Sequence, residues 1–482
     1  MSQPQPQLPP RRSQILEVNM PPVVRTRRAT TVRLPSGCAP GRRCVPLSPF
    51  DTRWIALPPV CHVFLFPAAR PQSPPRVPFS DVVRALSSSL ALVLQAFHPL
   101  AGQLAYSPEL GTVSIVCSED AGVTFVEAET DLEFSRLVKE GVDLDVDALR
   151  QLVPDIRREE LPAPVLAAQV TEFVGGSGGI AVGVSLNHCA ADGVGFFRFM
   201  ERWAAEAVAA SPSSEQVWVT RAMAPPLHDR KFVRFVGDQE LASGFLRLVA
   251  PDLPRVVPKQ DATPGPELPL TRRTFTFAAH AVRLLKHRLA ASGVVGAAPS
   301  TFAALAAHGW VCIARASGFT DGAPVFAVFL ADCRARMRPR VPDAYAGNCV
   351  ASCVVALSGA ELTGPDGALR AFSAIRDAVA EVKRDPLAGS SGWIARFRAV
   401  PPGRMVLLAG SPSFPAYAVD FGFGSPARVE RASVLPDGGM AIFAGREAGS
   451  VQACVAIAAE KMPAFQEIFQ VADSFTFESS RL

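Results

Sequence analysis

Two runs of alternating apolar residues flank a glycine-rich segment in the first half of the 482-residue chain. They cover residues 165–174 and 180–187, and Gly175-Gly176-Ser177-Gly178-Gly179 lies between them. Such alternation on both sides of a glycine turn predicts a β-hairpin. Apolar residues at helical spacing follow over residues 193–209. The chain is therefore expected to pass sharply from a strand to a helix at residues 188–192.

Strand and helix patterns alternate in both halves of the chain. Apolar spacing predicts helices at 82–97, 193–209, 279–291, 301–314 and 366–385. Further strands are expected at 113–117, 275–277, 325–332, 350–357, 416–419, 440–444 and 451–458. Residues 222–270 are rich in proline and charge and have few periodic runs. We expect a mixed α/β fold of two domains, residues 1–221 and 271–482, with a crossover linker at 222–270.

The composition excludes several classes of protein. Hydrophobic residues make up 49% and charged residues 19%, which is typical of a globular chain. The net charge of +4 comes without a basic stripe interleaved with aromatic residues, so nucleic acid is not an expected partner. No uninterrupted apolar run reaches the about 18 residues of a membrane-spanning helix, so we expect no membrane association.

The cysteines bear on metal binding and location. None of the ten forms a C-x-x-C pair, and Cys349-x3-Cys353 has no nearby histidine pair, so no metal site is expected. Buried free thiols in a reducing compartment are the favoured interpretation, and we expect a cytoplasmic monomer. The chain ends in Ser480-Arg481-Leu482, which resembles a peroxisomal address and makes the peroxisome the alternative.

His188 is the candidate for chemistry in the turn after the hairpin. Val182, Val184 and Leu186 share one face of the preceding strand, and His188 follows in phase with them. The imidazole should therefore reach a poorly solvated place, where it stays neutral and can accept a proton. Most core histidines are structural, but His188 stands together with Asp192 and Gly193 at a strand-to-helix turn. That combination favours a general base.

Asp192 stands where the next helix begins. Its carboxylate can cap that helix, and Gly193 would relax the turn. Because the residues between His188 and Asp192 form a turn, their spacing does not place both side chains on one helical face. We therefore expect Asp192 to hold the loop rather than to orient the imidazole.

Two motifs together carry a resemblance to a known family. The segment Asn187-His188-Cys189-Ala190-Ala191-Asp192-Gly193 resembles the H-x-x-x-D-G motif of the BAHD plant acyltransferases. Asp420-Phe421-Gly422-Phe423-Gly424 is similar to the second signature of that family, D-F-G-W-G, with Phe423 in place of tryptophan. The order of the motifs, their separation and the chain length also match. Pro46-Leu47-Ser48-Pro49-Phe50-Asp51, Phe97-His98-Pro99-Leu100-Ala101-Gly102 and Ala331-Asp332-Cys333-Arg334 resemble further blocks, so that the likeness spans roughly residues 15–475.

A third motif points to a branch of that family. Tyr345-Ala346-Gly347-Asn348-Cys349 is similar to the Y-F-G-N-C motif of the anthocyanin and phenolic-glycoside acyltransferases, many of which use malonyl-CoA. Ala346 replaces the usual phenylalanine, which would enlarge a neighbouring space. A malonyl group also needs a cation nearby, and Arg198 is the first one after the central motif.

The resemblance implies a fold and a reaction. The fold would be that of chloramphenicol acetyltransferase, with mixed sheets flanked by helices and an active-site channel between two domains. His188 would deprotonate an acceptor hydroxyl, which attacks the thioester of acyl-CoA directly, without an acyl-enzyme. Acyl-CoA is then a co-substrate and no cofactor is bound permanently. Malonyl-CoA is the first choice of donor and hydroxycinnamoyl-CoA or another acyl-CoA the second, with a phenolic, flavonoid or anthocyanin glycoside as acceptor.

The resemblance also assigns supporting roles. Asp192, Gly193, Asp420, Gly422 and Gly424 would shape the site, the last three by a tight turn on the CoA side of the channel. The phosphates of CoA need cations and polar groups. The candidates for CoA contacts are Lys286, on the polar side of its helix, together with Ser300 and Thr301.

Other functions remain as alternatives. A carrier-protein-dependent condensation-type acyltransferase shares the H-x-x-x-D-G motif, but its usual second histidine is Asn187 in this chain. A catalytically degenerate binding protein is a further alternative. Gly175–Gly179 also matches the G-x-S-x-G nucleophile elbow, but a strand rather than a helix is expected after Ser177. Asp420-Phe421-Gly422 matches the kinase D-F-G, yet no H-R-D loop precedes it.

Overall fold

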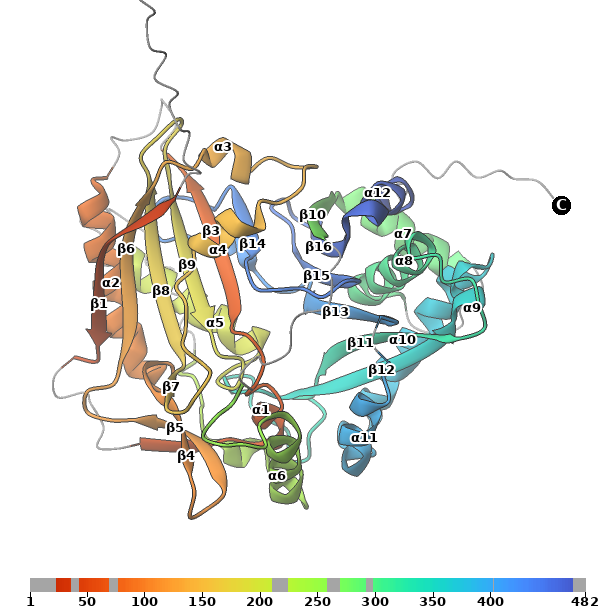
Figure 1. Ribbon diagram of the computed structural model, residues 1–482, viewed down its shortest axis with the longest axis horizontal. Helices are drawn as coiled ribbons and strands as arrows, with labels where there is room; N and C mark the ends of the chain where they lie inside the picture. The colour runs from red at the N-terminus through yellow and green to blue at the C-terminus, as the bar shows by residue number, and fades with distance from the viewer. Residues whose placement is uncertain are drawn as a thin grey trace, which may run out of the picture.

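A computed structural model describes residues 23–35, 43–68, 77–209, 224–257, 269–291, 298–401 and 403–470. Within these residues two mixed six-stranded sheets lie side by side, each with helices packed against it (Figure 1). This arrangement confirms the expected α/β architecture of two sheets flanked by helices. The predicted helices, and all but one of the predicted strands, are found at or overlapping their expected positions.

The first sheet is built mainly from the first half of the chain. Its order is β1 (Val24–Arg33), β6 (Gly122–Thr130), β8 (Leu166–Phe173), β9 (Gly179–Leu186), β3 (Val60–Pro67) and β14 (Arg428–Arg431). Only β6 and β8 run parallel, and the other neighbours are antiparallel. β8 and β9 form the predicted hairpin, with Leu166 opposite Leu186 and Phe173 opposite Gly179. Its inner face packs on α2 (Phe79–Ala96) and α5 (Gly193–Ala209), which also contact each other.

The second sheet comes from the second half. Its order is β10 (Leu270–Phe277), β16 (Val451–Ala458), β15 (Gly439–Ala444), β13 (Met405–Ser411), β11 (Pro324–Asp332) and β12 (Val350–Ser358). It is covered by α8 (Thr301–Ala316), which is almost wholly buried from Ala303 to Ala314 because its residues are apolar nearly all round. α7 (Ala279–Ala291), α10 (Gly367–Arg384) and α12 (Met462–Gln470) pack against α8.

Smaller elements complete the described structure. A four-stranded sheet has the order β2 (Arg43–Pro46), β5 (Thr112–Cys117), β4 (Gln103–Ser107) and β7 (Ala163–Pro164). The remaining helices are α1 (Pro49–Thr52), α3 (Phe134–Leu137), α4 (Val146–Gln151), α6 (Asp238–Val249), α9 (Gly359–Thr363) and α11 (Trp393–Arg398). α1 and α6 contact each other, and both pack into a separate apolar cluster with the segment 333–351.

The short strand β14 links the two halves of the chain. It lies far along the sequence, yet Arg428–Arg431 pairs antiparallel with β3 and forms one edge of the first sheet. In Figure 1 β14 lies between the first sheet and the strands β10, β15 and β16 of the second. Arg272 on β10 donates to the backbone oxygens of Arg431 and Ser433, at 2.5 Å and 3.1 Å, and so ties the edges of the two sheets together. The domain division at residues 222–270 stays a prediction.

One predicted strand is wrong. Residues 416–419 were expected to be extended, but Ala416–Ala418 is a 3-10 turn in which the amide of Ala418 donates to the oxygen of Pro415. Ala416 and Val419 are both fully buried, and their separation of three residues suits one face of a turn. The apolar residues that suggested a strand therefore belong to a packed turn and not to a strand of a sheet.

The described residues also bear on the expectations about membrane spans, cysteines and metal sites. No helix among them is long and apolar enough to span a bilayer. Every cysteine they include is a free thiol, and they contain no cluster of histidine, cysteine, aspartate and glutamate suited to a metal ion. The terminal Ser480-Arg481-Leu482 lies outside the described residues.

Candidate active site

His188 stands in the turn between β9 and α5. Its imidazole stacks on the indole of Trp54, with ring centroids 4.5 Å apart and an interplanar angle of 25°. The guanidinium carbon of Arg53 lies 4.5 Å from the centroid of the same indole. Nδ1 of His188 is buried and has no hydrogen-bond partner among the described residues. The alternation of residues along β9 directs the side chain of His188 inward, and stacking on Trp54 holds the ring there.

The surroundings of His188 keep it neutral. The pKa of His188 is lowered from 6.5 to about 4, mainly by burial, and the charges of Arg431 and Arg53 act in the same direction. The polar backbone of His188 and the charge of Asp192 act in the opposite direction but do not outweigh burial. A neutral imidazole at neutral pH is the form that can take a proton from a hydroxyl.

The pH dependence of activity should reflect this low pKa. Because only neutral His188 can act as a base, kcat/KM is expected to fall on the acid side with a midpoint near pH 4 rather than near 6.5. The profile is measured from initial rates with each enzyme sample returned to pH 7 as a control for unfolding. A reversible midpoint between pH 6 and 7 would contradict the low pKa of His188.

Acid should also weaken the fold. His188 and His62 have pKa values lowered by burial to about 4 and about 3, whereas both would titrate near 6.5 in the unfolded chain. Between those values the unfolded chain binds more protons than the native one, so the free energy of unfolding falls as pH drops below about 6.5. Urea denaturation at pH 7 and pH 5 checks this, and equal stabilities at the two pH values would contradict it.

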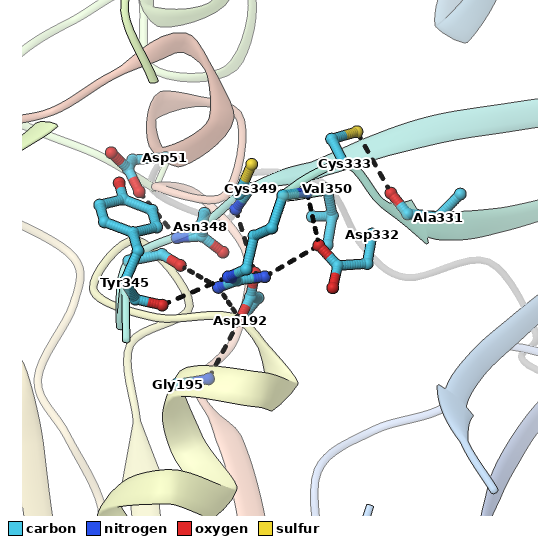
Figure 2. A network of polar contacts seen from close by, with 12 residues as sticks. Asp51, Asp192, Gly195, Ala331, Asp332, Cys333, Tyr345, Asn348, Cys349 and Val350 are labelled. Atoms are coloured by element: carbon cyan, nitrogen blue, oxygen red, sulfur yellow. Dashed lines mark hydrogen bonds and ion pairs between the residues drawn. The ribbon is translucent and has the colours of Figure 1, made fainter. Parts of the chain in front are cut away.

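Asp192 is part of a buried ion pair (Figure 2). Oδ1 accepts from the amide of Gly195 at 3.1 Å, which caps α5, and from Nη2 of Arg334 at 2.9 Å. Oδ2 accepts from the amide of Cys349 at 3.0 Å and lies 2.9 Å from Nη1 of Arg334. Burial by itself would raise the pKa of Asp192, but the charge and hydrogen bonds of Arg334 outweigh it, and the net pKa is lowered. No hydrogen bond joins the carboxylate to His188 among the described residues.

Arg334 extends this network into the second half of the chain. Nη2 donates to the oxygen of Gly347 at 2.8 Å, and Nε donates to that of Tyr345 at 3.3 Å. Nη1 of Arg334 also lies 3.1 Å from Oδ1 of Asp332. The loop after β9 is thereby attached to the segment 345–349 that precedes β12, as Figure 2 shows.

A second buried ion pair lies beside the first. Nε of Arg230 is 3.1 Å from Oδ2 of Asp51, and Nη2 donates to the oxygen of Ala190 at 2.9 Å. Nδ2 of Asn348 donates to Oδ1 of Asp51 and to the backbone oxygen of His188, both at 2.8 Å. The backbone of residues 188–190 is thus held by two side chains from distant parts of the sequence, Arg230 and Asn348, and both of these side chains bind Asp51.

Glycine suits position 193 for a different reason from the one expected. Its φ is not in the left-handed region, so the turn itself does not require glycine. A Cβ at this position would lie 2.3 Å from Cζ of Phe414, whose ring stacks on Phe197 of α5. Glycine therefore lets an aromatic side chain of the second half approach the start of α5.

The residues Asp420–Gly424 form a tight turn at the surface. Oδ1 of Asp420 accepts from the amides of Gly422 and Gly424, at 2.8 Å and 2.9 Å. Both glycines have positive φ, +98° and +87°, which other residues rarely adopt. Phe423 packs edge-on against Phe66 of β3, with centroids 5.2 Å apart. The aromatic ring thus packs against the first sheet, as expected for the replacement of tryptophan.

Of the three residues predicted to contact CoA, only Thr301 lines the described hollow. The hydroxyl of Ser300 caps α8 by accepting from the amide of Ala303 at 3.1 Å. Thr301 lines a hollow of about 430 Å³ together with residues 412–418 and 444–451, including Tyr417 and Arg446. Lys286 is a half-buried residue of α7 and does not line that hollow.

Comparisons with known proteins identify the family of the chain. The model of the Transferase family matches residues 24–471. The chain is 29% identical over 430 residues to phenolic glucoside malonyltransferase 1 of Arabidopsis thaliana, covering 84% of this chain and 88% of the relative. It is 27% identical to coumaroyl-CoA:anthocyanidin 3-O-glucoside-6''-O-coumaroyltransferase 2 of the same organism, covering 88% and 92%.

Solved structures share the fold. The crystal structure of vinorine synthase superposes with a TM-score of 0.68 at 19% identity, covering 92% of this chain and 96% of that one. The structure of F. sporotrichioides TRI101 complexed with coenzyme A and T-2 gives a TM-score of 0.63 at 18% identity, covering 88% and 97%. These likenesses confirm the two-domain acyltransferase fold.

The two-sheet fold, the buried histidine in the turn after β9 and the ion pair that joins this turn to the second half of the chain are typical of an acyltransferase that takes its acyl group from coenzyme A. The chain belongs to the Transferase family, the BAHD acyltransferases. It uses acyl-CoA as a co-substrate. The relatives carry different donors in their names at similar identity, so membership of the malonyl branch belongs to the proposal below.

Proposed function

We propose that this enzyme transfers a malonyl group from malonyl-CoA to a sugar hydroxyl of a phenolic or flavonoid glycoside, with His188 as general base. The observation that carries the proposal is the neutral imidazole of His188, held in the turn between β9 and α5 by stacking on Trp54. The relatives named for malonyl transfer to phenolic glucosides and anthocyanins support the donor and the acceptor class.

The reaction follows from the position of the base. His188 takes the proton of the acceptor hydroxyl as its oxygen attacks the thioester carbonyl. The tetrahedral intermediate collapses, the C–S bond breaks, and the thiolate of CoA receives the proton from the imidazolium. General-base catalysis of this kind contributes about 10²–10⁴-fold. Asp192 takes no part in the proton transfer, because its carboxylate is occupied by Arg334, Cys349 and Gly195.

The hollow beside Thr301 is the proposed entry of CoA. Arg446 offers a cation to the phosphates there, and Thr301 offers a hydroxyl. The segment that lines the hollow also carries Phe414, which stacks on Phe197 of α5 with centroids 5.1 Å apart. The donor side of the site would therefore run from this hollow along 412–418 toward the start of α5. Lys286 and Ser300 remain candidates only for contacts outside the hollow.

A screen of substrates tests the proposal. The purified full chain is incubated with malonyl-, acetyl- and coumaroyl-CoA against a panel of flavonoid and phenolic glucosides, without a carrier protein. Thiol release is followed together with the product mass. A malonylated glucoside as the main product supports the proposal. Turnover only with an acyl group tethered to a carrier protein would favour the condensation-type alternative, and no turnover with any pair would favour a degenerate binding protein.

A further inference from the structure

Two polar residues on neighbouring strands face the same interior as His188. Arg431 on β14 is directly opposite His62 on β3, and His62 is directly opposite Val184 on β9. Residues opposite one another in an antiparallel ladder project from the same face of the sheet. Val184 and Phe64 on that face belong to the core beneath α5. Arg431, His62 and the end of β9 therefore line one side of the junction between the two sheets, where Figure 1 shows β14.

His62 is enclosed by aromatic rings. It stacks on Phe196 at a centroid distance of 4.7 Å, and Phe197 and Phe443 meet it edge-on at 5.7 Å and 5.8 Å. Its side chain is buried, and neither ring nitrogen has a hydrogen-bond partner among the described residues. Burial and then the charge of Arg431 lower the pKa of His62 to about 3, so the ring is neutral beside a cation. Buried polar atoms without partners are uncommon and indicate a missing partner.

Arg431 is a cation without a counter-ion. Nε donates to the hydroxyl of Ser433 at 2.7 Å, and the guanidinium makes no other hydrogen bond and no ion pair with a described residue. The adjacent Glu430 is already engaged by Arg428 at 2.6 Å and by the hydroxyl of Thr274 at 3.0 Å. Burial and the charge of Arg272 lower the pKa of Arg431 to about 10. Arg431 is half-buried, and a guanidinium partly removed from water is stabilised by an anion beside it.

The other cations near the site are already engaged. Nη1 and Nη2 of Arg53 donate to the hydroxyl of Ser352 and the oxygen of Val350. Both Nη atoms of Arg272 donate to backbone oxygens, one to that of Arg431 in β14 and the other to that of Ser433. Of these three, Arg431 alone keeps both Nη groups without a partner among the described residues, and its charge lowers the pKa of His188.

We propose that Arg431, with His62 beside it, forms a carboxylate-binding subsite next to His188 that selects a substrate carrying a free carboxylate. Two Nη groups fit the two oxygens of a carboxylate, and an N–H of neutral His62 can donate a further hydrogen bond. The carboxylate belongs either to a dicarboxylic acyl donor such as malonyl-CoA or to an acidic acceptor. The assignment rests on the proposed acyl transfer and deepens it, because it gives the malonyl donor a cation whose charge acts on His188.

The experiment compares dissociation constants measured by titration calorimetry with the full chain. The donor arm uses malonyl-CoA and acetyl-CoA, and the acceptor arm uses a flavonoid glucuronide and the matching glucoside. Each pair is measured with wild type, Arg431→Met, Arg431→Lys and the control Arg84→Met, which removes an exposed cation of α2. Wild type and the control are expected to bind malonyl-CoA about tenfold or more tighter than acetyl-CoA, as one charge-assisted contact gives. Arg431→Met should remove that preference, and Arg431→Lys should keep part of it.

Each outcome decides one point. A preference lost only in the acceptor arm keeps the carboxylate subsite and assigns it to an acidic acceptor. Equal preference in wild type and Arg431→Met in both arms overturns the subsite. So does a melting temperature lowered by Arg431→Met and by Arg431→Lys alike, since a half-buried cation without a counter-ion should not stabilise the fold. Failure of wild type to bind any acyl-CoA would instead refute the proposed acyl transfer.

Discussion

Replacement of His188 by alanine is expected to lower kcat by about 10²–10⁴-fold while the fold stays intact, the range that general-base catalysis contributes. The imidazole is held by stacking on Trp54, and its Nδ1 has no hydrogen-bond partner among the described residues, so its removal leaves no charge or donor of a neighbour unsatisfied. Steady-state CoA release and the urea midpoint measure the two effects.

The matched control for this variant is His280→Ala. His280 is an exposed histidine at the start of α7, away from the ion pairs of the site. It should leave both kcat and the urea midpoint unchanged. If His188→Ala kept more than half of the wild-type kcat, the imidazole would not be the base.

Replacement of Asp192 by alanine is expected to destabilise the protein by about 3–5 kcal/mol, the cost of removing one partner of a buried ion pair. The side chains of Asp192 and Arg334 are 3% and 4% exposed, so water cannot replace the lost carboxylate. The amides of Gly195 and Cys349 lose their acceptor as well. Activity should fall together with stability, unlike in His188→Ala.

A double-mutant cycle separates the ion pair from these other contacts. Arg334→Met should be destabilising on its own, and the double variant Asp192→Ala/Arg334→Met should be less unstable than the sum of the two. Urea denaturation of the four proteins provides the values. Additive effects, or a loss below about 1 kcal/mol for Asp192→Ala, would show that the pair does not hold the turn.

The local parts of the site were predictable from the sequence. The alternation of β9 indicates which way His188 points, and the position of Asp192 before a helical pattern predicts its capping of Gly195. The positive φ angles of Gly422 and Gly424 agree with the turn expected from their residue type. Each of these follows from residues within a few positions of one another, where backbone preferences decide the structure.

The long-range contacts of the site were not predictable in the same way. Arg334 lies 142 residues from Asp192, and Arg230 lies 179 residues from Asp51. Arg334 and Asp51 stand in segments that resemble family blocks, but no periodic pattern gives the partner of a charge. Arg230 falls in the expected linker, where no sequence motif marked it as a residue of the site. β14 has four residues, three of them charged, so its pairing with β3 depends on the rest of the sheet.

A single-turnover experiment tests the central claim, that His188 activates an acceptor for direct transfer from acyl-CoA. Wild type and His188→Ala in excess are mixed with malonyl-CoA, with and without a phenolic glucoside that the screen identifies as an acceptor, and free CoA is followed in time. The account predicts CoA release by wild type only when the acceptor is present, at least about 100-fold faster than by the variant. A stoichiometric burst of CoA without acceptor, or equal rates in the two proteins, would contradict it.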